Sequence, residues 1–590
     1  MAEIQNPNQQ GGGGGGFDSR TIFVFSVIFL LVFLGLQIYK AKNPQTPPAN
    51  SQTQQQQASA PAAQTNPSAQ TSAAPAAPTA VDANAVQASA ESLTVVENEL
   101  YRITFTSRGA QVKSWILKKY KDDDGKPLDL VNQEAAAKYG LPLSLHSYDN
   151  GLKDRLNQSL YVPTATGSIS APGTLGFEYS ANGLHVTKTF SFDSSYVIHA
   201  EVSVTNQGAP LMTELLWPSG FGDQSTLPQY ASGMLDTAKG GDTDQVAPKK
   251  VSGGATLPGP FQWAGVSDLY FAAIFMPDQQ DNATLLTLHN TLPIPRNRKH
   301  PQANETDQAP ILGAGIGSSA AYSTRFFAGP KALEVLGSVN TNGAPNLEKV
   351  VSFGWWGWIA KPMFMVLRFF HEHVVGNWGW SILLLTLILN LAMLPTRFQM
   401  MKSSLKMQRI QPEMDSIKAK YAKYKTTDPR RQDMNKEMFD LQKREGVNMF
   451  GGCLPMLLQY PLLFGFYRML MNAIELRQAH WLWLPDLSAA DPWKILPIFV
   501  ILSMFLTQFF TPSPGMDQSQ QRMMAFMMPA IFGFMMWNIG SGVALYWACS
   551  NLLGVGQQLV MNRTSMGREM RALAAKRAAK RQGKVINAKR

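Results

Sequence analysis

One apolar segment, residues 381–396, constrains the fold of this chain more than any other part of it. It reads Ser-Ile-Leu-Leu-Leu-Thr-Leu-Ile-Leu-Asn-Leu-Ala-Met-Leu-Pro-Thr and carries two polar side chains one helical turn apart, Thr386 and Asn390. The strongly charged segment 397–445 follows, and a second apolar stretch then opens at Gly451. Polar groups in a bilayer core need partners or water. The pattern therefore predicts a multi-pass α-helical membrane protein with an internal polar cavity beside a basic, water-exposed segment.

Six segments are apolar and long enough to be expected as membrane helices. They are residues 21–39, 378–396, 452–471, 494–511, 523–538 and 542–561. The fifth is short for a full span, which implies a thinned bilayer or packing without tilt. The first is expected to be a retained anchor, because no small-residue cleavage site follows it before a proline-rich stretch.

The distribution of charge orients these spans. The segment Arg397–Glu445 has 13 Lys/Arg against 7 Asp/Glu, and the segment Arg563–Arg590 has 10 against 1. The rest of the chain is net acidic, because the total formal charge is +11. Short basic loops stay in the cytoplasm, so both segments are expected there. Counting spans from them places both termini in the cytoplasm and residues 41–350 across the membrane.

The large region across the membrane is expected to have two parts. Residues 41–92 are rich in Gln, Ala, Pro, Ser and Thr, and this composition predicts a disordered linker. Apolar and polar residues then alternate, most clearly at 185–205 on both sides of the turn Asp193-Ser194-Ser195, which predicts a β-hairpin. Residues 93–345 are therefore expected to form a β-sandwich. It contains no cysteine, so no disulfide supports it.

Two short motifs resemble ligand-binding sites, but each is better explained as an ordinary structural segment. The run Gly313-Ala-Gly-Ile-Gly317 resembles a dinucleotide loop, yet no strand–helix crossover follows it, and a simple loop is expected. The run His371-Glu372-His373 resembles part of a metal site, but the zinc pattern needs His at position 375, where the chain has Val375. This run lies in segment 353–373, whose tryptophans and spaced charges predict an amphipathic helix in the outer interface of the membrane.

The two basic segments are expected to be helical. Residues 397–447 should form a cytoplasmic hairpin, because apolar residues recur every three or four positions on both sides of a break near Lys425-Thr-Thr-Asp-Pro429. They are Met407, Ile410, Met414, Ile417, Tyr421, Met434, Met438 and Leu441. The tail 562–590 lacks aromatic residues for base stacking, so it is expected to contact RNA phosphates without reading sequence, or anionic lipids. The candidate contacts are Arg568, Arg571, Lys576, Arg577, Lys580 and Arg581.

The expected membrane core lacks the groups that ion-coupled transport and nucleotide hydrolysis need. Its helices carry no Asp, Glu, Lys or Arg in their middles, and no Walker A motif occurs. The outer region shows no convergent catalytic set, so the chain is not expected to be an enzyme, and neither cofactor nor metal is implied. The core instead offers neutral polar side chains: Thr386, Asn390, Gln459, Tyr546, Ser550, Asn551 and Gln557. Each alone is as consistent with a hydrogen bond between helices as with a site, but together they favour a shared hydrated groove.

Several specific motifs resemble those of one family. They are Asn448-Met-Phe-Gly-Gly-Cys-Leu-Pro-Met-Leu-Leu-Gln-Tyr-Pro461, Glu475-Leu-Arg-Gln-Ala479, Asp486-Leu-Ser-Ala489, Asp491-Pro492 and Ser541-Gly-Val-Ala-Leu-Tyr-Trp-Ala-Cys-Ser-Asn551. In these the chain resembles the YidC/Oxa/Alb family of membrane protein insertases, in its Gram-negative form with a large periplasmic domain. The resemblance implies a conserved five-helix core, a periplasmic β-supersandwich, a groove open to cytoplasm and lipid, and cooperation with ribosomes and the Sec translocon.

The charge pattern and the resemblance together assign each expected segment to the cytoplasm, the membrane or the periplasm. The segments are a cytoplasmic N-terminal tail (1–20), an anchor (21–39), a periplasmic linker (41–92), the β-supersandwich (93–345), the interfacial helix (353–373), the second span (378–396), the cytoplasmic hairpin (397–447), the third span (452–471), a periplasmic loop (472–493), the fourth span (494–511), a cytoplasmic loop (512–522), the fifth and sixth spans (523–538 and 542–561) and the basic cytoplasmic tail (562–590).

The chain departs from the family pattern at two positions. Many members place a cation in the groove four residues after the threonine that corresponds to Thr386, where this chain has Asn390. The paired tyrosines of relatives are Tyr546 and Trp547 here. Arg397 lies seven residues beyond Asn390 on roughly the same helical face, and we expect it to substitute in part for the missing cation at the groove mouth.

The expected function is that of an insertase and chaperone of the bacterial inner membrane, working alone or with the Sec translocon. Its expected partners are nascent membrane proteins, the Sec translocon, the ribosome through its rRNA backbone, and anionic lipids, with no small-molecule substrate. The candidate groove residues are Thr386, Asn390, Gln459, Tyr546, Trp547, Ser550 and Asn551, with Arg397 at the mouth. The alternative is a solute transporter or channel, which solute flux in liposomes would distinguish.

Overall fold

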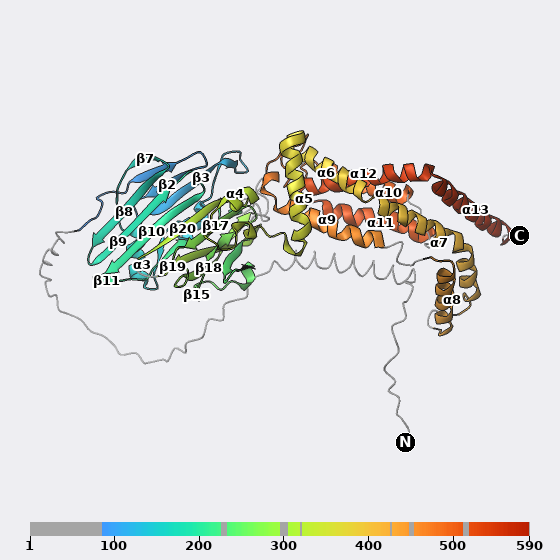
Figure 1. Cartoon of the computed structure of the whole chain (residues 1–590), viewed down its shortest axis with the longest axis horizontal. Helices are drawn as coiled ribbons and strands as arrows, with labels where there is room; N and C mark the ends of the chain where they lie inside the picture. Colours follow the sequence, from blue (N-terminus) through green and yellow to red (C-terminus); the bar gives the residue numbers. More distant parts are fainter. Residues whose placement is uncertain are drawn as a thin grey trace, which may run out of the picture. The chain divides into compact units, whose positions relative to one another are not determined.

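The computed structural model describes residues 85–225, 233–295, 305–318, 321–424, 428–447, 454–510 and 518–588 (Figure 1). Within these ranges, side chains are outside the description at 454–459, 509, 510, 518–522, 577, 578 and 580–588. The chain divides into two compact units, one within Lys40–Val351 and one that contains Ser352–Arg590. The predicted tail 1–20 and the predicted anchor 21–39 lie outside the described residues.

The first unit is rich in β-structure, and its largest sheet has ten strands (Figure 1). The order is β14-β13-β16-β17-β20-β10-β9-β8-β6, with β11 paired to β10, and all pairings are antiparallel. The strands are β6 (Val162–Pro163), β8 (Gly173–Ala181), β9 (Leu184–Phe192), β10 (Val197–Asn206), β11 (Ala209–Pro210), β13 (Met234–Lys239), β14 (Asp242–Val246), β16 (Trp263–Ser267), β17 (Phe271–Pro277) and β20 (Ala321–Pro330).

The described residues of this unit also form two five-stranded sheets and three short α-helices. One sheet has the order β4-β3-β2-β1-β7, with β1 and β7 parallel, and the other has the order β15-β18-β19-β12-β5. Their strands are β1 (Leu93–Glu97), β2 (Tyr101–Thr106), β3 (Gln111–Lys121), β4 (Pro127–Asp129), β5 (Leu145–His146), β7 (Gly167–Ser170), β12 (Glu214–Trp217), β15 (Ala255–Pro258), β18 (Thr284–Pro295) and β19 (Thr306–Gly317). The helices are α2 (Gln133–Tyr139), α3 (Asn150–Gln158) and α4 (Leu333–Ser338).

The hairpin predicted at 185–205 is present. Strands β9 and β10 pair antiparallel from Ile198 opposite Phe192 onward, and alternate side chains of β9 are buried. In the connecting turn, the carboxylate of Asp193 accepts hydrogen bonds from the backbone N–H and the hydroxyl of Ser195 at 2.7 Å. The alternation worked as a predictor because one face of the hairpin packs on the core and the other meets water.

The folded part begins before residue 93, where the sequence placed its boundary. Val86 forms a β-bridge with Ser180, and Thr106 donates a hydrogen bond to Glu91 at 2.7 Å. The expected linker 41–92 therefore overlaps the domain at its C-terminal end. Polar composition hid these contacts, because they are made by backbone groups and a carboxylate rather than by large apolar side chains.

The expectation of a loop at residues 313–317 is wrong, because they lie inside strand β19 between β18 and β12. A Cβ at Gly313 would lie 2.8 Å from the Cα of Pro218, and one at Gly315 would overlap the side chain of Leu216. The glycines allow β12 to approach closely, which is the other common role of glycine in a strand.

The core of the β-rich unit lies where its three sheets meet. Trp115 of β3, Trp217 of β12 and Phe326 of β20 are each fully buried. The ring centroids of Trp115 and Trp217 are 5.9 Å apart, and those of Trp217 and Phe326 are 5.6 Å apart. One aromatic side chain from each sheet thus joins the layers into a single core.

The second unit opens with two helices that meet at a sharp bend. Helix α5 (Gly357–Phe370) continues through one π-helical turn, η5 (His371–Val375), and α6 (Trp378–Ala392) follows. The bend lies at Gly376, whose φ of +60° is left-handed, and the side chain of Asn377 caps α6 by accepting from the N–H groups of Gly379 and Trp380. The exposed fractions of Trp355 and Trp358, 80% and 70%, agree with the predicted amphipathic character of segment 353–373.

Seven further α-helices follow in the described residues of the second unit (Figure 1). They are α7 (Leu394–Lys420), α8 (Arg430–Arg444), α9 (Leu454–Asn472), α10 (Ile495–Phe510), α11 (Gln518–Met536), α12 (Ser541–Arg563) and, as a separate C-terminal helix, α13 (Ser565–Ala588). The predicted second span 378–396 is interrupted, since α6 ends at Ala392 and α7 begins at Leu394 with Pro395 in its first turn. Proline favours the first turn of a helix because its missing N–H has no partner to lose there.

Within the described residues, no single helix has both the length and the apolar composition expected of a membrane span. The segments Gly354–Val375 and Trp378–Ala392 satisfy that test only as a pair, bent by 117°. The number of spans therefore stays a prediction.

Helices α7 and α8 pack antiparallel along the apolar residues predicted for a hairpin. Ile410 and Met414 of α7 are buried against Leu441 and Val447, with Met407, Ile417 and Met438 packed around them. Ion pairs flank this seam, with Lys420 bound to Glu437 at 2.7 Å and Arg444 to Glu413 at 3.3 Å. The spacing of three and four thus identified the packed face of both helices.

Candidate functional site

Asn390 is the centre of a polar cluster that joins three helices. On α6 its Nδ2 donates to the carbonyl oxygen of Thr386 at 2.9 Å and to the hydroxyl of Ser550 on α12 at 3.2 Å. Its Oδ1 accepts from Nη2 of Arg397, on the first turn of α7, at 3.0 Å. The side chain is 5% exposed, so these bonds satisfy an amide that has little access to water from outside.

Arg397 is a half-buried cation whose hydrogen-bond partner is neutral. Among the described residues no carboxylate forms an ion pair with it, and its hydrogen bond to Asn390 is the contact that fixes its position. A Cβ at Gly554 of α12 would lie 3.3 Å from Nη1, so the glycine leaves room for the guanidinium beside α12. The break between α6 and α7 at Met393 places the two side chains within reach although they belong to different helices.

A second amide approaches the same point from α12. Nε2 of Gln557 lies 3.5 Å from the carbonyl oxygen of Asn390, and its Oε1 is buried without a partner among the described residues. From sequence, Gln557 counts among the neutral polar side chains of the core but not among the candidate groove residues. Gln557 lies about two helical turns beyond Ser550 on α12. Residues seven apart on a helix share a face, so both side chains reach the cluster.

Thr386 is completely buried, but its hydroxyl is engaged within its own helix. Oγ1 donates to the carbonyl oxygen of Ile382 at 2.6 Å. This back-bonding satisfies the hydroxyl without a partner on another helix. Thr386 therefore contributes its backbone carbonyl to the cluster, as the acceptor for Asn390, rather than a free hydroxyl.

Helix α12 divides the remaining predicted groove residues between two faces. Tyr546 lies on the same face as Ser550 and stacks on Phe466 of α9, with ring centroids 4.1 Å apart. Trp547 and Asn551 point to the neighbouring helices α11 and α10. Their partners are Phe532, 5.4 Å away between ring centroids, and the hydroxyl of Ser503, 3.1 Å from Nδ2 of Asn551.

The structure therefore brings together some predicted site residues and separates others. Asn390, Arg397 and Ser550 form one cluster, with Tyr546 one turn away, while Asn551 belongs to a second hydrogen-bonded pair with Ser503. Sequence reasoning missed Ser503, although a lone serine in the apolar run of α10 was a usable signal. Gln459 lies in α9, but its side chain is outside the described set.

The loop before α10 holds the first turns of two of these helices. The buried carboxylate of Asp491 accepts from the N–H groups of Trp493 at 3.0 Å and Leu496 at 2.7 Å, which caps α10. Ser541, the first residue of α12, donates its hydroxyl to the carbonyl oxygen of Ala489 at 2.7 Å. This loop thus fixes how α10 and α12 start relative to each other.

The basic tail forms α13, which packs on the first half of α7. Met561 and Met570 are buried against Met401 and Leu405. Arg409 of α7 binds both carboxylate oxygens of Glu569, at 2.8 and 2.9 Å. Of the predicted contact residues, Arg568, Arg571 and Lys576 are exposed, and the side chains of Arg577, Lys580 and Arg581 are outside the described set.

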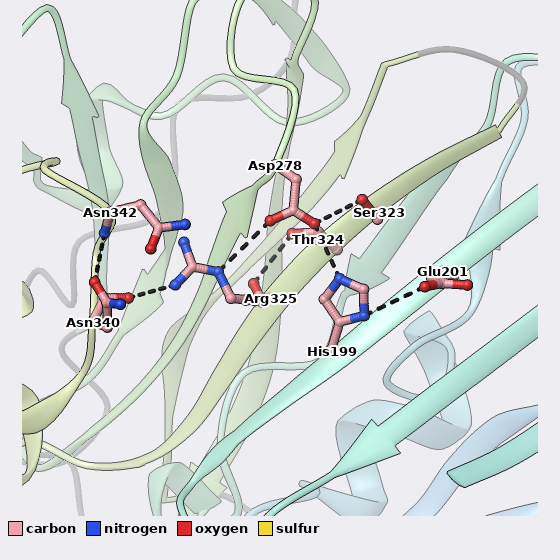
Figure 2. A network of polar contacts seen from close by, with 8 residues as sticks. All are labelled: His199, Glu201, Asp278, Ser323, Thr324, Arg325, Asn340 and Asn342. Carbon is pink, nitrogen blue, oxygen red and sulfur yellow. Dashed lines mark hydrogen bonds and ion pairs between the residues drawn. The ribbon is translucent and has the colours of Figure 1, made fainter.

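In the β-rich unit, one polar network contains the residue types of a catalytic triad but not its connectivity (Figure 2). Asp278 lies in the middle, and it accepts from the hydroxyl of Ser323 at 2.7 Å while Nε2 of His199 lies 3.0 Å from the same oxygen. Arg325 approaches the other carboxylate oxygen at 3.7 Å and donates to the carbonyl oxygen of Asn340. The histidine does not contact the serine, so it cannot take the serine proton. The network instead ties β10, β17 and β20 to the segment at 340.

No group of three or more His, Cys, Asp or Glu side chains in the described part of the chain is arranged to hold a metal ion. His371, which the sequence analysis rejected as a metal ligand, stacks on Trp378 with ring centroids 3.9 Å apart. Its ring is thus engaged in packing beside the bend between α5 and α6.

Comparison with known proteins assigns both units. Residues 369–569 match the family model of the 60Kd inner membrane protein, and residues 93–366 match that of the YidC periplasmic domain. A membrane protein insertase YidC from Citrifermentans bemidjiense is 33% identical over 554 residues, covering 89% of this chain and 95% of the relative. One from Geobacter sulfurreducens is 32% identical over 485 residues, covering 79% and 85%. The crystal structure of an active YidC insertase with its first transmembrane domain resolved aligns at 15% identity and a TM-score of 0.32, over 81% of this chain and 95% of that one.

Proposed function

The chain belongs to the YidC family of membrane protein insertases, and from this membership we propose that it inserts its substrates past the cluster formed by Asn390, Arg397 and Ser550. As a member of the family it is a membrane protein insertase with a β-rich periplasmic domain and a helical C-terminal part. The transporter or channel alternative is not favoured, since the relatives that match most of the chain are insertases.

The barrier to insertion is the transfer of the polar flank of a substrate across hydrocarbon. A charged side chain at the centre of a bilayer costs about 2.5–3.5 kcal/mol on insertion scales. A hydrated groove that reaches part of the way across shortens that path. The substrate helix then leaves along apolar helices, stabilised by roughly 25 cal/mol for each Å² of apolar surface it buries. No covalent step is needed.

The observation that carries this proposal is the bond between Arg397 and Asn390. Where the family resemblance implies a groove cation in many members, this chain has a neutral amide, and a cation from the next helix binds that amide at 3.0 Å. A neutral amide leaves the charge of Arg397 uncompensated. The proposed groove therefore combines neutral hydrogen-bonding groups along α6 and α12 with one cation near the start of α7.

The proposed groove also includes Gln459, Tyr546, Trp547 and Asn551. Tyr546 continues the face of α12 that carries Ser550. Trp547 and Asn551 face α11 and α10, so they would form a second wall, and Gln459 would contribute from α9.

The membrane arrangement is part of the same proposal. We propose six spans, with both termini and the α7–α8 pair in the cytoplasm and residues 41–350 in the periplasm. The net charge of the segment Arg397–Glu445 supports this orientation, because basic loops are retained in the cytoplasm. The proposed partners are nascent membrane proteins, the Sec translocon, ribosomal RNA and anionic lipids, and the proposed chemistry is non-enzymatic.

Reconstitution into liposomes tests the groove. We expect wild-type protein to insert a single-span substrate with an acidic flank, without solute flux, and Arg397→Ala to reduce insertion several-fold. Arg397→Lys should keep part of the activity, because it retains a cation but loses the planar donor geometry. Photo-crosslinkers at 386, 390, 459 and 547 should capture the substrate.

Two results would contradict the proposal. If Arg397→Ala inserts the substrate as well as wild type does, the cation has no role there. If crosslinks form at exposed positions such as Leu552 but not at 386 or 390, the substrate follows another path.

A further inference from the structure

A cleft of about 710 Å³ opens on the β-rich unit, and all the residues that line it belong to that unit. Strands β2, β3 and β5 and helices α2 and α3 contribute to its lining. Amides, hydroxyls and charged groups predominate among the side chains that face it. They include Gln111, Lys113, Ser144, His146, Lys153 and Asn157. Its volume is that of a site for a small ligand or a few residues of extended chain.

A buried lysine from the largest sheet fixes two turns that adjoin the lining of this cleft. Nζ of Lys188 donates to the carbonyl oxygens of Gly109 and Leu143 at 2.8 Å and of Ala110 at 3.2 Å. Lys188 is fully buried, and its three acceptors belong to the two turns next to the lining residues Arg108, Gln111 and Ser144.

Two of those three acceptor residues have strained backbones. The φ angles of Ala110 and Leu143 are +48° and +60°, in the left-handed region that side chains other than glycine rarely adopt. Such strain persists only where the surroundings over-determine it, and it gathers at binding and active sites. A fully buried lysine that holds two strained turns next to a cleft is thus a costly arrangement for a surface with no ligand.

One wall of the cleft is built so that a strand cannot add to it. Strand β5 is an edge strand, and the side chain of Asn157 on α3 pairs with its outer side. Nδ2 donates to the carbonyl oxygen of Leu145 at 2.7 Å, and Oδ1 accepts from the N–H of Leu145 at 2.9 Å. This amide takes the place of a neighbouring strand. Recognition in the cleft must therefore rely on side chains rather than on β-strand addition.

The charges in the cleft leave an excess of cations. Glu91 is bound by Arg108 at 3.1 Å, and Lys138 pairs with Glu134 at 3.8 Å. Lys113 and Lys153 form no ion pair among the described residues, and Asp154 is the one carboxylate of the lining without such a pair there. His146 also lines the cleft, and its buried Nε2 has no hydrogen-bond partner within the described structure. It can donate or accept one hydrogen bond.

We propose that this cleft binds a short, extended polypeptide segment carrying carboxylates, with Lys113 and Lys153 on the carboxylates and His146 on a backbone or side-chain amide. The segments that membrane proteins expose outside the cytoplasm are poor in Lys and Arg. Such segments therefore bring few cations that Lys113 and Lys153 would repel, and any carboxylates they carry are free to pair with these two lysines. This inference rests on the proposed periplasmic location of the domain, and it adds a substrate contact that is separate from the groove.

Binding of labelled peptides to the full-length protein in neutral-lipid nanodiscs tests it. The probe is a ten-residue peptide of Gly, Ser and four Glu, measured by fluorescence anisotropy, beside the same peptide with Gln for Glu. We expect saturable binding of the Glu peptide at least tenfold tighter than that of the Gln peptide. Lys113→Gln with Lys153→Gln should abolish the difference.

The matched control is Lys119→Gln, an exposed lysine on the same strand as Lys113 but outside the cleft lining, which should leave binding unchanged. His146→Phe should weaken both peptides equally, because it removes a neutral contact. If Lys119→Gln weakens binding of the Glu peptide as much as the Lys113 and Lys153 substitutions do, the peptide is held by general charge attraction and the proposal is overturned. Displacement of the peptide by inorganic phosphate at equal charge would assign the site to phosphate groups instead.

Insertion of a substrate in liposomes is measured in parallel, because the two proposals can fail separately. Loss of peptide binding with intact insertion of neutral-flank substrates supports a separate periplasmic contact. Normal peptide binding in Arg397→Ala with impaired insertion would leave this inference standing. Absence of any Glu-dependent binding in the wild-type protein would overturn it.

Discussion

Asn390 shows how one neutral side chain can organise a membrane-protein site. It satisfies both its donor and its acceptor groups, toward Thr386 and Ser550 on one side and toward Arg397 on the other. A buried donor or acceptor that loses its partner costs about 1–3 kcal/mol. Asn390 is therefore needed both to position Arg397 and to keep Ser550 satisfied.

Substitutions at Asn390 separate hydration from charge. We expect Asn390→Leu to lower insertion several-fold for all substrates, because it leaves the guanidinium of Arg397 and the hydroxyl of Ser550 without their partner. Asn390→Asp keeps the acceptor and adds a carboxylate that neutralises Arg397. It should reduce insertion of acidic-flank substrates and spare neutral ones. Insertion rates for the two substrate types in liposomes are the measurement, and equal effects of Asp on both would remove charge from the mechanism.

Lys188 gives the β-rich unit a dependence on pH. Burial lowers the pKa of Lys188 to about 7, against about 10.4 for an exposed lysine. Between these values the unfolded chain binds a proton that the folded protein does not, so the free energy of unfolding rises with pH. From pH 7 to pH 9 this contribution is about 2 kcal/mol, and it is lost as the pH falls through 7.

The variant Lys188→Met should remove that rise. Other buried groups act in the opposite direction, for burial raises the pKa of Glu214 to about 7, so the comparison between variant and wild type is what isolates Lys188. Hydrogen exchange of β8, β9 and β10 in the full-length protein, corrected for the intrinsic exchange rate at each pH, measures the opening free energy. If the opening free energy changes by the same amount in the variant and in the wild type between pH 7 and pH 9, Lys188 does not titrate in this range.

At the scale of elements, α6 depends on a close approach at its first turn. A Cβ at Gly379 would lie 2.7 Å from the Cβ of Trp481 and would overlap its indole ring. Trp481 is itself nearly buried, at 7% exposure, and it packs edge-on against Trp380. The helix is thus seated on the loop that also fixes α10 and α12.

We expect Gly379→Ala to destabilise the helical unit by about 1–3 kcal/mol, the usual cost of overpacking. Thermal unfolding in detergent should shift to lower temperature. Gly556→Ala on α12 is the control, since a Cβ there meets nothing within 4 Å and alanine favours helix. A variant Gly379→Ala as stable as wild type would show that the loop around Trp481 moves freely.

Residue spacing predicted the elements of this chain well where burial of a single face determines the pattern of apolar residues. The hairpin of β9 and β10 and the seam between α7 and α8 follow directly from residue spacing. The roles of glycine did not follow, because Gly313 and Gly315 are required by a strand that is distant in sequence. Composition alone cannot distinguish such a close approach from a loop.

The candidate site was predicted in part. The polar residues of α6 and α12 were identified as exceptions in apolar helices, and Arg397 was proposed from its spacing. The division of α12 into a face toward Asn390 and a face toward Ser503 depends on the rotation of the helix against its neighbours. That rotation is set by packing against the neighbouring helices. A helix that is apolar on all sides has no periodic pattern from which the rotation could be predicted.

At the scale of the helical unit, α7 connects the candidate groove to both basic parts of the chain. Its first turn holds Arg397 against Asn390, and Arg409 pairs with Glu569 of α13. Farther along, Ile410 and Met414 pack on α8. One helix thus contacts the candidate groove, α8 and α13.

The tail offers the last test, because phosphate contacts have a known dependence on salt. Each phosphate contact contributes about 0.7–0.9 to the slope of log affinity against log salt. Replacing Lys576, Arg577, Lys580 and Arg581 with Gln should therefore lower the slope for ribosome binding by up to about 3, with no preference among RNA sequences. Lys436→Gln with Lys443→Gln on α8 is the control for lost charge at another exposed surface of the same unit. Ribosome co-sedimentation across a salt series gives the slope. An unchanged slope with weaker binding to anionic vesicles would assign the tail to lipid.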